Sequence, residues 1–148
     1  MKYTEKISNK LNELLEKNYD AEKGYLNSAE NVESSNLKIF FKNRASERSQ
    51  FAKELRTEIL SYGQIPEDDG SFKGAIHRNW MSLKSLFSTN DEEAILEEAL
   101  RGEKASLEEY KEILKEDAFA PSTRKMLEQQ QQKIQAAINI LMVEEELA

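Results

Sequence analysis

The chain has 148 residues and a formal net charge of -7, with 28 Asp or Glu against 21 Lys or Arg. That length can bury a real core, and one domain over residues 1–148 is expected. The negative charge disfavours nucleic acid as a partner, because binding phosphates needs a basic surface. The sequence contains no cysteine, which excludes disulfides and thiol chemistry. We see no apolar run near the roughly 20 residues of a membrane span and no signal-peptide core, so we expect a cytoplasmic protein without a membrane partner.

Helix-forming residues dominate, and the chain has only five Gly and two Pro, a balance typical of all-α proteins. Apolar residues recur at helical spacing in four long segments. We predict helices at about residues 4–31, 35–62, 89–116 and from 121 onward.

Local signals mark where these helices begin. Ser34 or Ser35 suits the N-cap of the second helix. Thr89 and Glu92 match a capping box, with Thr89 at the N-cap and Glu92 three residues later. Pro121 is well placed at the first position of the last helix.

The stretch between the second and the next long helix is predicted to cross the whole bundle. Residues 63–72 form a loop with two Gly and a Pro, and residues 73–87 read as a short helix. Such a single long crossover is typical of ferritin-like bundles. We therefore predict an all-α, ferritin-like four-helix bundle with a short fifth helix in its crossover. That helix would carry His77, the only histidine, and Trp80, whose face could dock a partner protein.

Each long helix also carries a polar residue near its midpoint, on the face that should be buried. The candidates are Asn18 with Glu22, Arg48, Glu103, and Gln130 or Gln131. In one interpretation they form a buried polar layer of Asn18, Glu22, Arg48, Glu103 and Gln131. A guanidinium has five donors, so Arg48 could bridge Glu22 and Glu103 and take the place of a metal.

The alternative interpretation is a metal site. Ferritin-like di-iron sites use one Glu from each of two helices and a Glu-x-x-His pair from each of the other two. The single carboxylates would be Glu22 and Glu103, and the pairs would start at Glu47 and Glu128. Iron or manganese would be the metal. Gln stands where each His should be, and amide oxygens bind transition metals weakly.

Three stretches carry a family resemblance: RASERSQFAKEL at residues 44–55, HRNWMSLK at 77–84, and EALRGE at 98–103, followed by Tyr110. Together they resemble an uncharacterised bacterial family of ferritin-like four-helix-bundle proteins, a domain-of-unknown-function family. The resemblance spans nearly the whole chain, and its most specific part is the His-Arg-x-Trp box. It implies the fold and no particular activity.

These observations lead to three functional hypotheses. The first is a non-catalytic ferritin-like protein with a structural, interaction or stress-related role and without a cofactor, for which a homodimer is a plausible state. The second is a metal-binding storage protein or oxidase. The third is a helical module that binds a partner protein through the Trp80 face. The sequence leaves open whether the protein is an enzyme, because no intact di-iron motif is present.

Overall fold

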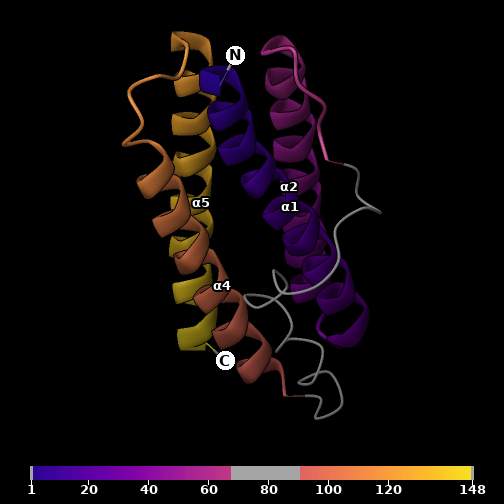
Figure 1. Cartoon of the computed structure of the whole chain (residues 1–148). Helices are drawn as coiled ribbons and strands as arrows, with labels where there is room; N and C mark the ends of the chain where they lie inside the picture. Colours follow the sequence, from indigo (N-terminus) through magenta and orange to yellow (C-terminus); the bar gives the residue numbers. More distant parts are fainter. Residues whose placement is uncertain (1, 68–90, 148) are drawn as a thin grey trace.

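The computed structural model describes residues 2–67 and 91–147, and four long helices account for most of them (Figure 1). They are α1 (Lys2–Asn31), α2 (Ser35–Ser61), α4 (Glu92–Ile113) and α5 (Pro121–Leu147). The predicted four-helix bundle is confirmed. The predicted short helix at 73–87, with His77 and Trp80, lies outside the described residues and stays a prediction.

The helices form two antiparallel hairpins, α1 with α2 and α4 with α5. Figure 1 shows α2 and α4 running in the same direction, so that the end of α2 and the start of α4 lie at opposite ends of the bundle. This connectivity distinguishes a ferritin-like bundle from a simple up-and-down one. In the same view α2 and α5 lie behind α1 and α4.

The apolar stripes of the four helices meet in one continuous core. Burying a large apolar side chain contributes about 1.5–3 kcal/mol, so the bundle depends mainly on this core. Tyr25 and Phe41 stack within it, with ring centroids 5.8 Å apart. The fully buried aliphatic side chains include Leu11, Leu14, Leu15, Leu55, Ile59, Ile95, Leu96, Leu127 and Leu141.

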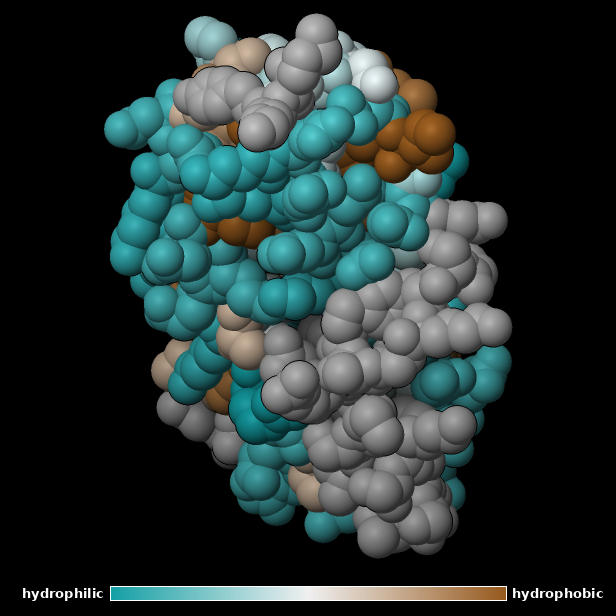
Figure 2. Space-filling model, in the orientation of Figure 1, coloured by the Kyte–Doolittle hydropathy of each residue, from teal (hydrophilic) through white to brown (hydrophobic). Residues whose placement is uncertain are grey.

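The surface over α1 and α4 is mostly hydrophilic, as Figure 2 shows. Scattered apolar side chains nevertheless reach solvent, among them Leu60 near the end of α2 and Ile65 just after it. No helix among the described residues is long and apolar enough to cross a membrane.

Two of the predicted helix starts are confirmed, and one is wrong. Ser34 caps α2 by accepting a hydrogen bond from the Leu37 amide at 3.3 Å, and α5 begins at Pro121. The predicted N-cap of α4 at Thr89 is wrong, because Asp91 caps the helix by accepting from the Ala94 amide at 3.1 Å, and Thr89 itself lies outside the described residues.

Glu92 is therefore the first residue of α4 and is free to reach another element. Its carboxylate accepts hydrogen bonds from the backbone amides of Glu33 (2.7 Å) and Ser34 (3.2 Å) in the turn between α1 and α2. The first residue of α4 thus stabilises the turn between α1 and α2. Bonds of this kind to a charged acceptor are stronger than neutral ones.

Replacing Glu92 by Ala should lower the free energy of unfolding by about 1–3 kcal/mol, because two turn amides lose a charged acceptor. Urea unfolding followed by circular dichroism would measure the loss. Glu93→Ala is the matched control, since Glu93 is exposed and lies in the same helical turn. Equal losses in the two variants would contradict the role of Glu92.

Candidate functional site

A layer of polar side chains crosses the bundle at its mid-height and draws on all four helices. Every member is at most 2 % exposed. The layer consists of Asn18 and Tyr25 from α1, Arg48 from α2, Glu103 and Tyr110 from α4, and Gln130 from α5.

Arg48 is the positive charge of this layer. Its Nη1 donates to Asn18 Oδ1 at 2.8 Å, and its Nη2 donates to Glu103 Oε1. The guanidinium carbon also lies 5.8 Å from the centre of the Phe51 ring. Burial pulls the pKa of Arg48 down, but Glu103 and the two buried tyrosines raise it by more, and the net shift is upward. Arg48 therefore stays a cation.

Glu103 supplies the opposite charge, and both of its oxygens are engaged. Oε1 accepts from Arg48, and Oε2 accepts from the hydroxyl of Tyr25. Burial, followed by the neighbouring Glu103, raises the pKa of Tyr25 well above its usual value. The phenol thus keeps its proton and remains a donor to the carboxylate.

A chain of hydrogen bonds leads from Arg48 outward. The Asn18 amide donates to the Tyr110 hydroxyl (3.1 Å), which donates to Gln130 Oε1 (2.6 Å). The amide of Gln130 then donates to Glu54 Oε1 at 2.9 Å, where the chain reaches a half-buried carboxylate.

Every donor in this chain points away from Arg48 and toward Glu54. Bonds aligned in one direction polarise one another and become stronger. The second donor contacts agree with the same amide orientations: Asn18 Nδ2 donates to the Leu14 carbonyl (2.8 Å), and Gln130 Nε2 donates to the Phe51 carbonyl (3.3 Å). Burial is the main cause that raises the pKa of Tyr110, which remains a neutral phenol.

The structure brings together three of the residues proposed for the polar layer, namely Asn18, Arg48 and Glu103. Glu22 is only half-buried. The choice of Gln131 for the layer is corrected, because Gln131 is half-buried and Gln130 occupies the buried position. Successive residues on a helix point about 100° apart, so only one of the two can face inward.

Sequence reasoning missed three members of the network. Tyr25 and Tyr110 were not among the predicted members of the layer, although they lie on the same helices as Glu22 and Glu103. Their spacing of three and seven residues from those carboxylates was the available signal. Glu54 carried no signal, because it lies on the edge of the buried face of α2.

The four carboxylates of the alternative metal site do not form a ligand cluster. Glu103 is engaged by Arg48 and Tyr25, Glu47 is half-buried and pairs with Arg44 at 2.6 Å, and Glu128 is exposed. In residues 2–67 and 91–147 no three His, Asp or Glu side chains are grouped so that they could hold a metal ion. This donor set does not fit the di-iron centre of a ferritin-like protein.

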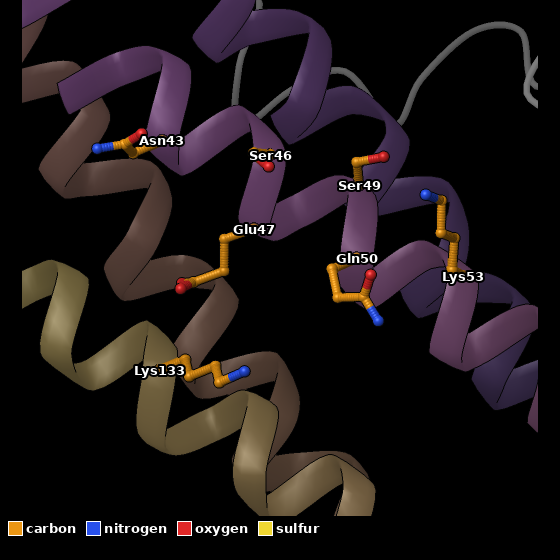
Figure 3. A pocket seen from close by; sticks show the side chains of 7 residues that line it. All are labelled: Asn43, Ser46, Glu47, Ser49, Gln50, Lys53 and Lys133. Carbon is orange, nitrogen blue, oxygen red and sulfur yellow. The ribbon is translucent and has the colours of Figure 1, made fainter. Parts of the chain in front are cut away.

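A second candidate site is a polar hollow of about 440 Å³ between α2 and α5 (Figure 3). Most of its lining comes from the outer face of α2, while Lys133 closes it from α5. In Figure 3 the carboxylate of Glu47 and the ammonium of Lys133 flank the space from the two helices. The lining residues are Asn43, Ser46, Glu47, Ser49, Gln50, Lys53 and Lys133.

Residues 65–67, which follow α2, are hydrogen-bonded to α1 close to the acidic side chains around Glu16. Asn12 donates to the Ile65 carbonyl (3.3 Å) and accepts from the Glu67 amide (2.8 Å), and Tyr19 donates to the Glu67 carbonyl (3.3 Å). Partial burial, followed by the nearby charges of Glu67, Glu13 and Asp20, raises the pKa of Glu16 to about 7.

These features define a class of protein: a ferritin-like four-helix bundle with a charged layer at its centre. The same fold occurs in the solved structure of a dodecameric thioferritin, the bacterioferritin-related protein from Bacteroides fragilis. The two structures match with a TM-score of 0.73 at 16% sequence identity, over 94% of this chain and 83% of the other. At that identity the match shows the fold alone.

The chain belongs to the DUF2383 family, a domain of unknown function, whose sequence profile matches residues 6–117. The family resemblance inferred from the sequence is thereby confirmed. No curated protein sequence matches the chain.

Replacing Arg48 by Ala should lower the free energy of unfolding by about 3–5 kcal/mol, because Glu103 would be left buried without its counter-charge. Thermal and urea unfolding would measure this loss. The double variant Arg48→Met/Glu103→Leu should recover much of it, since both charges are then gone. Arg44→Ala is the control, because the Arg44–Glu47 pair is half-exposed and such pairs contribute at most about 1 kcal/mol. Unchanged melting in Arg48→Ala would contradict a buried charge pair.

The raised pKa of Glu16 predicts that stability falls as the pH rises from 4.5 to about 7. In that interval the folded chain binds more protons at Glu16 than the unfolded chain does, so deprotonation favours unfolding. Urea midpoints measured between pH 5 and 8 should decline less in Glu16→Gln than in the wild type. The exposed Glu97→Gln should follow the wild type. An identical decline in all three proteins would refute the assignment to Glu16.

Proposed function

We propose that this protein is a non-catalytic member of the ferritin-like class with a structural or interaction role, stress-related by analogy with that class. The observation that carries the proposal is the engagement of Glu103, whose two oxygens accept from Arg48 and Tyr25. The residue best placed to bind a central metal therefore already has a protein partner on each oxygen.

The electrostatics of the layer support the same conclusion. A metal in this position would bring two or more positive charges next to the buried guanidinium of Arg48, which remains protonated. Like charges at such distances in a poorly solvated interior repel strongly. A metal would also have to break the contacts of Glu103 with Arg48 and Tyr25, and within residues 2–67 and 91–147 no cluster of three His, Asp or Glu side chains could replace them.

The runner-up function is a storage protein or oxidase that binds iron or manganese through Glu22, Glu47, Glu103 and Glu128. It would require these side chains to leave their present partners or turn inward from the surface. The thioferritin is described as a dodecamer, and by analogy with it we include self-association in the proposed role.

Metal titration separates the two functions. The metal-free protein would be titrated with Fe(II), Mn(II) and Zn(II) in separate calorimetric experiments, and its melting temperature would be measured with each metal. We expect no stoichiometric binding at the bundle centre and no rise in melting temperature, because a ligand that binds only the folded state raises its stability.

Two variants make the titration specific. Glu103→Gln removes the central carboxylate, and Glu128→Gln removes an exposed one. Stoichiometric binding that is lost in Glu103→Gln and kept in the wild type would overturn the non-metal proposal. Weak binding that is reduced equally by both substitutions would be surface binding and would leave the proposal standing.

A further inference from the structure

One face of the bundle differs from the rest of the chain in its charge. Although 33% of all residues are charged, the 15 residues from Gln129 to Val143 on α5 include a single charged one, Lys133, and no acidic one. Many of their side chains are exposed: Gln129, Gln132, Lys133, Gln135, Ala136, Asn139, Ile140, Met142 and Val143.

The neighbouring face of α2 continues this surface. Gln130 on α5 donates to Glu54 and to the Phe51 carbonyl on α2, so the two helices lie side by side. Three of the six α2 side chains that line the polar hollow are small and uncharged, namely Asn43, Ser46 and Ser49, as Figure 3 shows. The other three are Glu47, Gln50 and Lys53. Small side chains of this kind lose little conformational entropy when they become buried.

The face becomes apolar toward one end of the bundle. Ile140 follows Lys133 by seven residues on α5, and Ile39 precedes Glu47 by eight residues on the antiparallel α2, which is about two turns in each case. Both lie in the same direction from the hollow. Ile140 is 44% exposed, Ile39 is 58% exposed and Val143 is 54% exposed. Exposed apolar side chains thus lie about two helical turns from the polar hollow on both helices.

We infer that the face made by α2 and α5 is an interface through which the chain pairs with a second copy of itself. A two-fold interface requires a patch that is complementary to itself. This face meets that requirement, because Glu47 and Lys133 flank the same hollow from opposite helices. A two-fold axis through the hollow would bring the ammonium of one copy toward the carboxylate of the other.

The net charge also favours this face over the others. Two chains of net charge -7 repel one another, so they approach best where carboxylates are fewest. A basic partner would instead be drawn to the acidic surfaces, such as the group around Glu16 on α1. The stretch from Gln129 to Val143 offers such a partner no acidic contact.

The size of the face sets the expected strength. Two adjacent helices about 30 Å long and about 10 Å wide give a footprint of roughly 600 Å², somewhat below the roughly 800 Å² per partner of a standard stable interface. We therefore expect a reversible dimer rather than a permanent one. This inference rests on the interaction role proposed above, and it identifies the partner as a second copy of the chain.

The test is sedimentation velocity of the full chain over a concentration series that spans roughly micromolar to hundreds of micromolar. The wild type should shift from monomer to dimer as its concentration rises. Ile140→Glu places a carboxylate in each half of the interface and should raise the dissociation constant about tenfold or more. Ala136→Glu, on the same face, should do the same.

Leu26→Glu is the matched control, because Leu26 on α1 is 45% exposed, almost the same as Ile140. It should leave the association unchanged. A wild type that stays monomeric throughout the series, or an association that Leu26→Glu weakens as much as Ile140→Glu, would overturn the inference. A larger assembly would support it if Ile140→Glu and Ala136→Glu disrupt it, and would refute it if they do not. Metal titration does not depend on this face, so the two proposals can fail separately.

Discussion

The buried contact between Arg48 and Glu103 is the constraint around which the bundle is arranged. It places a full positive and a full negative charge where water is excluded, and such charges are tolerated only when they are paired and hydrogen-bonded. Two neighbours in the layer meet that requirement. Asn18 accepts a hydrogen bond from the other guanidinium nitrogen of Arg48, and the Tyr25 hydroxyl donates to the other carboxylate oxygen of Glu103. Because these groups come from α1, α2 and α4, the layer fixes how those helices are aligned relative to one another.

In the function proposed here, the same layer takes the place of the metal centre of di-iron proteins with this fold. In a di-iron protein the ions supply the positive charge that holds several inward carboxylates together. Here the guanidinium of Arg48 supplies the positive charge, and the single buried carboxylate of Glu103 balances it. The fold is shared with the thioferritin at 16% sequence identity, and a shared fold does not by itself fix the chemistry at its centre. Fold and function are separable in this way because the site is a small set of residues carried on a common scaffold.

The fold could be predicted from the sequence, because four long apolar stripes and one long connection allow few other arrangements. The layer was predictable only in part. Arg48 and Glu103 interrupt apolar stripes, and so their burial is visible in the sequence. The choice between Gln130 and Gln131 could not be made from the sequence. Gln130 lies three residues after Leu127 and four before Ile134, whereas Gln131 lies four residues after Leu127 and three before Ile134. Both spacings place a residue near the same face, and only the packed structure decides between them. The N-cap of α4 was mispredicted for a similar reason, since Thr89 and Asp91 are both good N-cap residues.

The bond from Glu92 to the turn between α1 and α2 has a consequence for how this protein can vary. It fixes the point at which the chain re-enters the bundle, whatever path the connection takes to reach it. Variation in sequence that keeps this carboxylate and the two turn amides should therefore preserve the position of α4 against the first hairpin, and with it the approach of Glu103 to Arg48.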